Sequence, residues 1–541
     1  MKEKIKQLAL ENAIKYGQAR PGAVIGHLAA DKKIKNIKKL IPEINKIINE
    51  VNSLSNEERL RLYKPIKKEK KIEKKELPNL KNPKKVVMRF MPSPSGPAHI
   101  GHSYVCSLNS EYCKKYKGKF ILKIDDTNPE NIYPLAYDML ENELQWLTKN
   151  NIKQILKSSE RLEIYYKYAK KLIKSKHAYV CTCNPDIFRE LRAKSQPCPC
   201  RDLKDQEKKF QDMFKKYSPG QAVLRIKTNI KDKNPAMRDF PVLRINDHFH
   251  PITKNKYKVW PLMNFSSAID DLDLKVTHSI RAKEHADNAK KQAIIHKYLK
   301  VKTPESLFVG RINFTDLKVS ASQTRRLIED GKYSGWYDPR LPFLAALRKR
   351  GFQPEAFIKY ALDVGVTLTD KTVSKEEFFK KIEHFNKEII DKTSNRYFFI
   401  ENPKKIKIKK APKINTKAPL HPDFPKRGSR ILKTKGEFYI QDKLEKNKIY
   451  RFMHLFNFKN NEFISEKYDP RLDATLIHWL PVSKDLVNVE IVMPDASIKK
   501  GLGEPSLKKV KVDSIVQMER MGFCKLDEKK KNKLIFYYAH N

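Results

Sequence analysis

The sequence predicts a multidomain α/β protein built around a doubly wound nucleotide-binding domain. Its 541 residues exceed one hydrophobic core, since a domain takes roughly 100–200 residues. Residues 86–125 read as strand, turn, helix and strand. That order opens a doubly wound domain, whose ligands bind beyond the carboxyl ends of the strands. Short β-prone runs dominate residues 396–541, and strands at such close spacing are typical of β-barrels.

Residues 1–63 are predicted to form a helical extension. Pro42 lies inside an apolar pattern there and indicates a helix break or a new helix start. Residues 64–85 are charged and punctuated by proline, which predicts a basic linker. The apolar pattern is one helical stripe with intervals of three and four: Ile34, Ile37, Ile41, Ile44, Ile48 and Val51.

The nucleotide-binding domain is predicted to be split by an insertion. β-rich runs (AVLRIKT, FPVLRIND) follow a cysteine cluster, and an α/β pattern returns with VWPLMNF and VTHSIRA. Helical runs such as FLAALRKRG come next and predict a connector. The expected units are an extension (1–63), a linker (64–85), a first domain half (86–180), an insert (181–258), a second half (259–323), a connector (324–395) and a β-barrel region (396–541).

The composition is strongly basic and not that of a membrane protein. Lys and Arg number 112 against 63 Asp and Glu, a formal net charge of +49. Such a surface attracts polyanions, nucleic acid above all, although part of the lysine content can simply solvate exposed faces. The mean hydropathy is −0.66, and no apolar run approaches the roughly 20 residues of a spanning helix. A cytoplasmic protein without a membrane partner is expected.

Two histidines flank a glycine at the predicted strand-to-helix turn MPSPSGPAHIGH. Such a turn directs backbone N–H groups and the positive helix end at a phosphate. His99 and His102 can hydrogen-bond an α-phosphate as charge builds in an in-line displacement, and Gly101 allows close backbone approach. A lone H-x-G-H also occurs in cofactor nucleotidylyltransferases, and a pair of surface histidines is the alternative.

Four of the seven cysteines form a cluster. Seven cysteines in a chain of this length do not make a disulfide framework. Two C-x-C pairs fourteen residues apart can close a tetrahedral Zn²⁺ site without an open position, which is a structural site. Free thiols or a lost site are the alternatives. The predicted ligands are Cys181, Cys183, Cys198 and Cys200.

The run LKVSAS at residues 317–322 resembles the K-M-S-K-S loop of class I aminoacyl-tRNA synthetases. The wider sequence resembles their glutamyl/glutaminyl branch, in family order from about residue 86 to 490, and residues 10–60 resemble the helical extension of archaeal glutamyl enzymes. The resemblance implies a Rossmann-type catalytic domain, an inserted acceptor-stem-binding domain and a β-barrel region that reads the anticodon. It is based on PSPSGPAHIGH, LKIDDTNPE, AYVCTC, VLRIKT, NPAMRD, WPLMNFSSAIDD, VTHSIRAKEH, GWYDPRLP, IHWLPV and VQMERMGFC.

The resemblance also implies roles for individual residues. Asp125 would hold the α-ammonium of the amino acid, whereas Asp126 fits better as a cap of the following turn. The implied catalytic residues are His99, His102 and Lys318. The implied ATP-binding residues are Pro92, Ser93, Gly101, Ser320 and Ser322, and the implied glutamate-binding residues are Arg89, Asp125 and Arg281.

The expectation of glutamate as the substrate amino acid rests on Arg281. This arginine ends the strand candidate VTHSIRA, where a guanidinium can bind the side-chain carboxylate of glutamate in a bidentate pair. The matching position of glutaminyl enzymes is typically small and uncharged, because an amide would leave a buried guanidinium unpaired. A surface arginine in a salt bridge is the alternative.

The chain departs from the family pattern at three positions. Ala321 replaces the second lysine of the signature loop, and Gln323 follows where many archaeal relatives have a lysine. We expect Arg325 and Arg326 to substitute for the missing cation. Met263 lies where bacterial relatives tend to have tyrosine.

The resemblance predicts a ligase that activates L-glutamate with ATP and Mg²⁺ and transfers it to tRNA(Glu), with tRNA(Gln) open as a second acceptor and a monomer as the family default. Three alternatives remain: a glutaminyl enzyme, an enzyme that glutamylates a modified tRNA base, and a non-catalytic RNA-binding paralogue. Unstacked anticodon bases need aromatic faces and positive charge. Candidates on one strand run, which can equally be core, are Tyr450, Arg451, Phe452 and Phe456.

Overall fold

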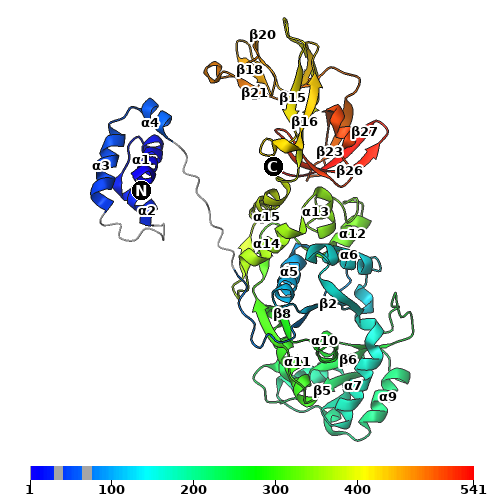
Figure 1. The fold of residues 1–541 in the computed structure, drawn as a ribbon. Helices are drawn as coiled ribbons and strands as arrows, with labels where there is room; N and C mark the ends of the chain where they lie inside the picture. The colour runs from blue at the N-terminus through cyan, green and yellow to red at the C-terminus, as the bar shows by residue number, and fades with distance from the viewer. Residues whose placement is uncertain (1, 30–39, 64–75) are drawn as a thin grey trace. The chain divides into compact units, whose positions relative to one another are not determined.

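The computed structural model describes residues 2–29, 40–63 and 76–541. The chain divides into two compact units, residues 1–74 and residues 75–541 (Figure 1). The predicted linker at 64–85 lies outside the described residues up to residue 75. Each unit has its own hydrophobic core and is considered separately below.

The first unit consists of helices around one small core. Helix α3 begins at the position that Pro42 indicated, and it buries Ile44, Ile48 and Val51 as the apolar stripe predicts; Ile34 and Ile37 lie outside the described residues. The helices are α1 (Lys2–Tyr16), α2 (Pro21–Ala29), α3 (Ile41–Asn52) and α4 (Asn56–Leu62).

A buried arginine connects the segments of this unit. Arg59 is 9% exposed. Its guanidinium donates hydrogen bonds to three backbone carbonyls, those of Gly17, Val51 and Asn52, at 2.7, 3.0 and 2.8 Å. Gly17 follows the end of α1, and Val51 and Asn52 are the last two residues of α3, where helix geometry leaves acceptors without intrahelical partners.

The second unit contains the expected doubly wound domain. The strands of this domain are all parallel: β1 pairs with β2, β2 with β3, and β8 with β9. Thr277 joins the two groups, since its N–H donates to Val87 O at 2.9 Å, and the strand order is therefore β3-β2-β1-β8-β9. These strands are β1 (Val87–Phe90), β2 (Lys119–Ile124), β3 (Ile152–Lys157), β8 (His278–Ala282) and β9 (Glu305–Val309).

Helices connect these strands as in other doubly wound sheets. Helix α5 (Ile100–Lys115) joins β1 to β2, and α6 (Ala136–Thr148) joins β2 to β3. Helix α10 (Met263–Asp273) leads into β8, and α11 (Ala286–Tyr298) joins β8 to β9. The carboxyl ends of β1, β2 and β8 therefore open toward the start of α5, where a ligand site is expected.

The insert has an antiparallel sheet of its own, with the order β4-β5-β6-β7. Its last strand comes from VWPLMNF, the run that we expected to begin the second half of the nucleotide-binding domain; it pairs with β6 instead. A strand of three residues has no pattern that tells which sheet it joins. The elements are α7 (Leu162–Lys174), β4 (Ala178–Cys181), α8 (Pro185–Ala193), α9 (Gln206–Lys215), β5 (Val223–Ile226), β6 (Pro241–Ile245) and β7 (Val259–Pro261).

Part of the predicted linker belongs to the second unit. Leu77 and Leu80 are buried and join the core beneath the parallel sheet. Lys115 Nζ donates to Leu77 O at 2.7 Å, and Tyr116 Oη accepts the N–H of Leu80 at 3.0 Å. Charge and proline alone suggested a solvated arm, but two leucines among the lysines are enough to attach the segment.

The connector is helical, as the sequence predicts, with one short parallel strand pair. Its helix α13 lies against both neighbours: Leu344 N–H donates to Ala98 O at 2.9 Å, and Arg350 donates to Tyr538 O and Ala539 O at 3.1 and 2.8 Å. The elements are β10 (Ile312–Phe314), α12 (Ala321–Glu329), α13 (Leu344–Arg350), α14 (Pro354–Val364), β11 (Lys371–Val373) and α15 (Lys375–Ile390).

The C-terminal region is all β and has two hydrophobic cores. The first core contains Tyr450, Phe452 and Phe456, which are 3%, 0% and 0% exposed. Because these rings are buried, they do not present a face to an RNA base. Arg451 remains partly exposed, with its guanidinium 5.6 Å from the centre of the Tyr468 ring.

The larger C-terminal sheet has the strand order β12-β25-β26-β27-β23-β24-β13. Its strands are β12 (Asn395–Tyr397), β13 (Phe399–Glu401), β23 (Val487–Val492), β24 (Ile498–Gly503), β25 (Ile515–Met518), β26 (Gly522–Lys530) and β27 (Lys533–His540). The smaller sheets contain β14 (Lys404–Lys407), β15 (Asn415–Pro419), β16 (Ser429–Lys433), β17 (Glu437–Ile440), β18 (Ile449–Phe452), β19 (Asn457–Lys459), β20 (Glu462–Ser465), β21 (Thr475–Ile477) and β22 (Leu480–Pro481).

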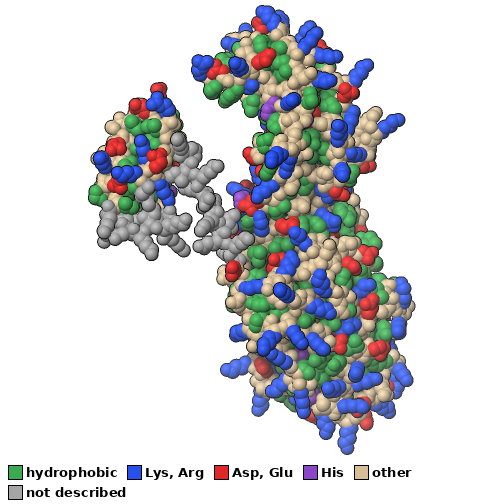
Figure 2. All heavy atoms as spheres, in the orientation of Figure 1, with side chains coloured by type: hydrophobic (Ala, Val, Ile, Leu, Met, Phe, Trp, Pro, Cys, Tyr) green, Lys and Arg blue, Asp and Glu red, His purple; other side chains and the backbone are tan. Residues whose placement is uncertain are grey.

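Basic side chains cover the surface widely. Figure 2 shows Lys and Arg distributed over the visible face of residues 75–541 and not confined to one patch. Among the described residues, no helix has the length and apolarity that crossing a membrane requires.

We predict that Arg59→Met destabilises the N-terminal unit by about 2–4 kcal/mol, because three backbone carbonyls lose a charged donor. Hydrogen exchange of residues 2–29 and 40–63 in the intact chain measures this. The matched control is Arg61→Met at an exposed position of the same helix, which should change stability by no more than about 0.5 kcal/mol. Equal protection in the two variants would contradict the role of Arg59.

Candidate functional site

The turn between β1 and α5 brings the two predicted histidines together. His99 is the N-cap of α5, and its Nδ1 accepts the N–H groups of Gly101 and His102 at 3.1 and 3.4 Å. The two imidazole rings stack, with centroids 3.7 Å apart. A Cβ on Gly101 would lie 2.9 Å from His99 Cε1, so a larger residue here would displace the His99 ring.

A buried glutamic acid side chain also fixes the turn. Glu143 on α6 is 5% exposed, and its Oε2 accepts the N–H of Ala98 at 2.6 Å. Burial raises the pKa of the Glu143 carboxyl to about 8. On the other side, Ile100 N–H donates to Pro342 O at 3.2 Å. The turn is therefore fixed by α6 and by the start of α13, and Glu143 is a residue that the sequence analysis did not single out.

Both histidines are held in the neutral form. Burial lowers the pKa of His102 to about 4, and burial together with the neighbouring His102 lowers the pKa of His99. At neutral pH each ring therefore has one N–H and one acceptor nitrogen. With Nδ1 of each ring accepting from the backbone, the N–H lies on Nε2, from which it can donate to a ligand oxygen.

A pocket of about 200 Å³ opens beside this turn. It brings together four of the predicted site residues, namely Arg89, Gly101, His102 and Arg281, with the departure position Met263 on its wall. Its size suits an amino acid rather than a whole nucleotide. The remaining lining residues are Phe90, Met91, Val105, Ser267, Ile280, Ala282, His285, Asn288 and Gln292.

One aspartate at the pocket faces two arginines. Arg89 donates from Nε and Nη2 to the two oxygens of Asp271 at 2.7 and 2.9 Å, a bidentate pair. Arg281 Nη2 lies 3.5 Å from Asp271 Oδ2. The three side chains are 7%, 9% and 0% exposed for Arg89, Arg281 and Asp271. Two buried cations and one buried anion leave one positive charge uncompensated, which a ligand carboxylate would neutralise.

Neutral groups orient the Arg281 guanidinium. Its Nε donates to Ser279 Oγ at 3.0 Å, and its Nη1 donates to Gln292 Oε1 at 2.5 Å. Burial and the nearby Arg89 lower the pKa of Arg281 to about 10, so it stays charged at neutral pH. The sequence analysis named Arg281 from the family resemblance and from its place at the end of a strand candidate. Asp271 and Gln292 were missed, since no local pattern distinguishes them from other polar residues of a helix.

Asp125 and Asp126 differ in environment at the end of β2. Asp125 N–H donates to Pro92 O at 2.9 Å, and its carboxylate accepts from Thr127 and Ser158 hydroxyls at 3.0 and 3.3 Å. Asp126 is buried, and its Oδ1 accepts the N–H of Ser159 at 2.8 Å. The expectation that Asp126 caps the turn after β2 is therefore wrong, since its carboxylate binds the distant Ser159. Asp125 accepts from Thr127 in that turn, stays partly exposed and lies outside the residues that line the pocket.

The other predicted ATP-binding residues lie outside the small pocket. Pro92 is buried in the turn and Ser93 is exposed. In the loop before α12, Lys318 and Ser322 are exposed, and Ser320 caps α12 by accepting the N–H of Gln323 at 3.4 Å.

Ala321 has a packing role in this loop. A Cβ built on Gly96 would lie 2.8 Å from the Ala321 Cβ and 3.2 Å from Trp336. The loop thus contacts the Pro-rich turn directly, through a methyl group where the family pattern has a lysine. Arg325, expected to substitute for that lysine, lies with its guanidinium 5.8 Å from the centre of the Tyr133 ring, and Arg326 is exposed.

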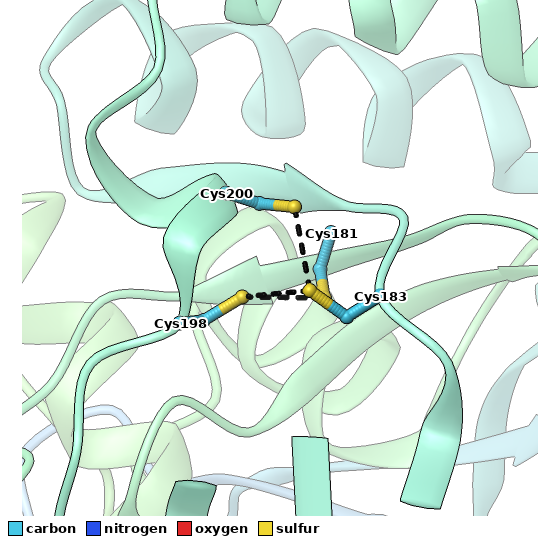
Figure 3. Close-up of side chains that lie close together, drawn as sticks. All are labelled: Cys181, Cys183, Cys198 and Cys200. Carbon is cyan, nitrogen blue, oxygen red and sulfur yellow. Dashed lines mark hydrogen bonds between the residues drawn. The ribbon is translucent and has the colours of Figure 1, made fainter. Parts of the chain in front are cut away.

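The four clustered cysteines converge as the spacing predicts. Their sulfur atoms point toward one another from the end of β4 and from the turn after α8 (Figure 3). The Sγ–Sγ distances are 3.6 Å for Cys181–Cys198, 3.5 Å for Cys183–Cys198 and 3.6 Å for Cys183–Cys200. Four Zn–S bonds of about 2.3 Å in a tetrahedron put sulfurs about 3.8 Å apart, so the donor set fits zinc.

We predict that the His102 imidazole titrates at about pH 4. Its folded pKa lies below the value of an unfolded chain, so neutral His102 contributes stability above about pH 6.5, and this contribution is lost as pH falls toward 4. NMR of ¹³C-labelled histidine measures the titration, with His102→Gln to assign the signal. An imidazole that titrates near pH 6.5 would contradict the buried, neutral state described above.

Family comparisons agree with this arrangement. Residues 85–392 match the catalytic domain of class I (E and Q) tRNA synthetases, and residues 394–476 and 476–527 match two models of their anticodon-binding domain. Residues 85–392 contain the turn, the pocket and the cysteine cluster. Leu77 and Leu80 precede the matched range.

Curated relatives match over the whole chain. A glutamate–tRNA ligase of Methanocaldococcus jannaschii is 44% identical and that of Methanobrevibacter smithii 41% identical, each over 100% of this chain and at least 99% of the relative. That of Pyrococcus furiosus is 42% identical over 98% of both chains. With domain models and full-length relatives in agreement, the chain belongs to the class I (E and Q) tRNA synthetase family.

Proposed function

We propose that this protein is a glutamate–tRNA ligase, which activates L-glutamate with ATP and transfers it to the 3′-terminal ribose of tRNA(Glu), with release of AMP and pyrophosphate. The observation that supports glutamate is the charge of the pocket: Arg89 and Arg281 against the single carboxylate of Asp271. The side-chain carboxylate of glutamate neutralises this site. An amide would leave a buried guanidinium without its partner, which costs several kcal/mol.

In the first step the α-carboxylate of glutamate attacks the α-phosphorus of ATP and pyrophosphate leaves. No general base is needed, because the carboxylate is already ionised at neutral pH. His99 and His102 donate from neutral N–H groups to the phosphate oxygens as charge develops. Asp125 holds the α-ammonium group, and Arg281 binds the side chain. Arg89 uses Nε and Nη2 on Asp271, which leaves Nη1 as the donor for the amino acid.

The signature loop acts on the phosphates that leave. Lys318, Ser320 and Ser322 contact the triphosphate, and Mg²⁺ that accompanies ATP neutralises phosphate charge. Arg326 supplies the second cation in place of the lysine that Ala321 replaces. It is exposed on α12, one turn from the loop, and its long side chain can reach a bound phosphate.

In the second step a hydroxyl of the terminal ribose attacks the carbonyl carbon of glutamyl-adenylate, and AMP leaves. The basic surface and the C-terminal β region are proposed to bind the tRNA. The second candidate acceptor is tRNA(Gln). We further propose a monomeric, cytoplasmic enzyme. The C-terminal β region argues against an enzyme that modifies a tRNA base, and the intact His99, Gly101, His102 and Asp125 argue against a non-catalytic paralogue.

The cysteine cluster is proposed to hold a structural Zn²⁺. Four thiolates leave no coordination position for a substrate, so the ion would fix the fold of residues 181–200 and take no part in the reaction. This segment begins at the end of β4, in the insert that the family resemblance assigns to the acceptor stem.

Aminoacylation with labelled glutamate or glutamine, with purified tRNA(Glu) or tRNA(Gln), ATP and Mg²⁺, tests the proposed function. We predict glutamate transfer to tRNA(Glu), and a loss of kcat/KM for glutamate of about 10²–10³-fold in Arg281→Ala, equivalent to about 3–4 kcal/mol. The matched control Arg311→Ala removes an arginine that is 66% exposed and should keep wild-type activity. Preference of the wild type for glutamine would contradict the proposal, as would equal activity of the two variants.

We predict that the purified chain binds one zinc ion and that Cys183→Ser or Cys198→Ser abolishes binding. Metal content by mass spectrometry measures the first effect. Hydrogen exchange should show loss of protection confined to residues 181–200 and the adjoining strands. The matched control is Cys106→Ser, a buried cysteine of α5 outside the cluster. Full zinc content in the cluster variants would exclude the site.

A further inference from the structure

A chain of side-chain amides starts at Arg281 and includes Gln292 and Asn288, which line the pocket. Gln292 on α11 is 2% exposed, and its Oε1 accepts from Arg281 Nη1 at 2.5 Å. Its Nε2 donates to Asn264 Oδ1 at 3.5 Å, and Asn264 Nδ2 donates to Asn288 Oδ1 at 3.1 Å. Asn288 Nδ2 lies 3.1 Å from His285 Nδ1.

The chemistry of these groups fixes the direction of the whole chain. A guanidinium only donates, so the Gln292 amide must present its oxygen to Arg281 and its nitrogen to Asn264. Asn264 and Asn288 likewise each accept through the amide oxygen and donate through the amide nitrogen. At the end of the chain His285 Nδ1 accepts from Asn288, which places the imidazole proton on Nε2. The amide of Gln292 therefore has one permitted orientation, set by Arg281 on one side and by Asn264 on the other.

Gln292 also sets the net charge of the pocket. Arg281 has close hydrogen bonds to two neutral groups, Ser279 and Gln292, and a longer 3.5 Å contact to Asp271. Neutral acceptors fix the plane of the guanidinium without cancelling its charge. A carboxylate in the place of the Gln292 amide would form a short buried ion pair with Arg281. In a low-dielectric site this pair would neutralise the positive charge that binds the substrate carboxylate.

We infer that Gln292 is a specificity-determining positioning residue: it orients Arg281 and, because it is uncharged, keeps that arginine available for the side-chain carboxylate of glutamate. This inference rests on the proposed function. Gln292 acts through Arg281 and is not itself a catalytic residue. Since it affects recognition of the amino acid side chain and not the transfer of the phosphoryl group, its effect should fall on KM more than on kcat.

The test uses three variants of the full-length chain and measures kcat and KM for glutamate and for glutamine. Gln292→Glu changes charge at constant shape. Gln292→Met keeps the size, adds no charge and removes the acceptor for Nη1. Gln221→Glu makes the same chemical change at an exposed residue between α9 and β5. Melting temperatures, and equilibrium binding of non-hydrolysable sulfamoyl analogues of glutamyl- and glutaminyl-adenylate, accompany the kinetics.

The inference predicts that Gln292→Glu raises the KM for glutamate at least tenfold with a smaller change in kcat. The preference for glutamate over glutamine, in kcat/KM and in analogue binding, should fall at least tenfold. Gln292→Met should raise the KM severalfold through loss of orientation but change the preference far less, and Gln221→Glu should match the wild type. If Gln292→Glu does not fold, the KM effect of Gln292→Met decides: an unchanged KM overturns the inference.

An unchanged preference in folded Gln292→Glu, or a loss confined to kcat, would overturn the inference and leave the proposed function intact. Equal loss of preference in Gln292→Glu and Gln292→Met would also overturn it, since charge would then have no part. A wild-type chain that transfers neither amino acid to tRNA and binds neither analogue would overturn the proposed function itself, and this inference with it.

Discussion

The site depends on one buried carboxylate, that of Asp271, which lies between two arginines from different strands. It forms a bidentate pair with Arg89 and a longer contact with Arg281. Three buried charges of this kind are stable only when they are paired or receive a ligand. The unequal sharing leaves Arg281 as the cation without a full partner, and this asymmetry creates a place for a carboxylate substrate.

The topology of the parallel sheet explains why Arg89, Arg281 and Asp271 lie close together. Arg89 and Arg281 lie at the carboxyl ends of β1 and β8, which are neighbours in a parallel sheet, and such ends form the ligand edge of doubly wound domains. Asp271 comes from α10, which precedes β8. The histidine turn begins α5 beside the same edge. Hydrogen bonds to Glu143 of α6 and to Pro342, just before α13, hold the turn in place.

Local patterns in the sequence could predict the residues that act through position in one element. His99 and His102 were predictable because a strand-to-helix turn places them at the ligand edge, and the cysteines because their spacing suits one metal. Arg281 was named from the family resemblance, which its place near a strand end supports. Asp271 was not predictable, since its partner Arg89 is 182 residues away. Gln292 has no distinguishing pattern. The strand Val259–Pro261 is too short for its sequence to indicate which sheet it joins. Long-range pairing is tertiary information that periodicity does not contain.

A crystal structure of the full chain with L-glutamate bound tests the charge arrangement most directly. The account predicts that the side-chain carboxylate of glutamate accepts hydrogen bonds from Arg281, that Arg281 keeps its bond to Gln292, and that Arg89 remains paired with Asp271. A glutamate side chain bound away from Arg281, or an Arg281 that has become the bidentate partner of Asp271, would contradict it.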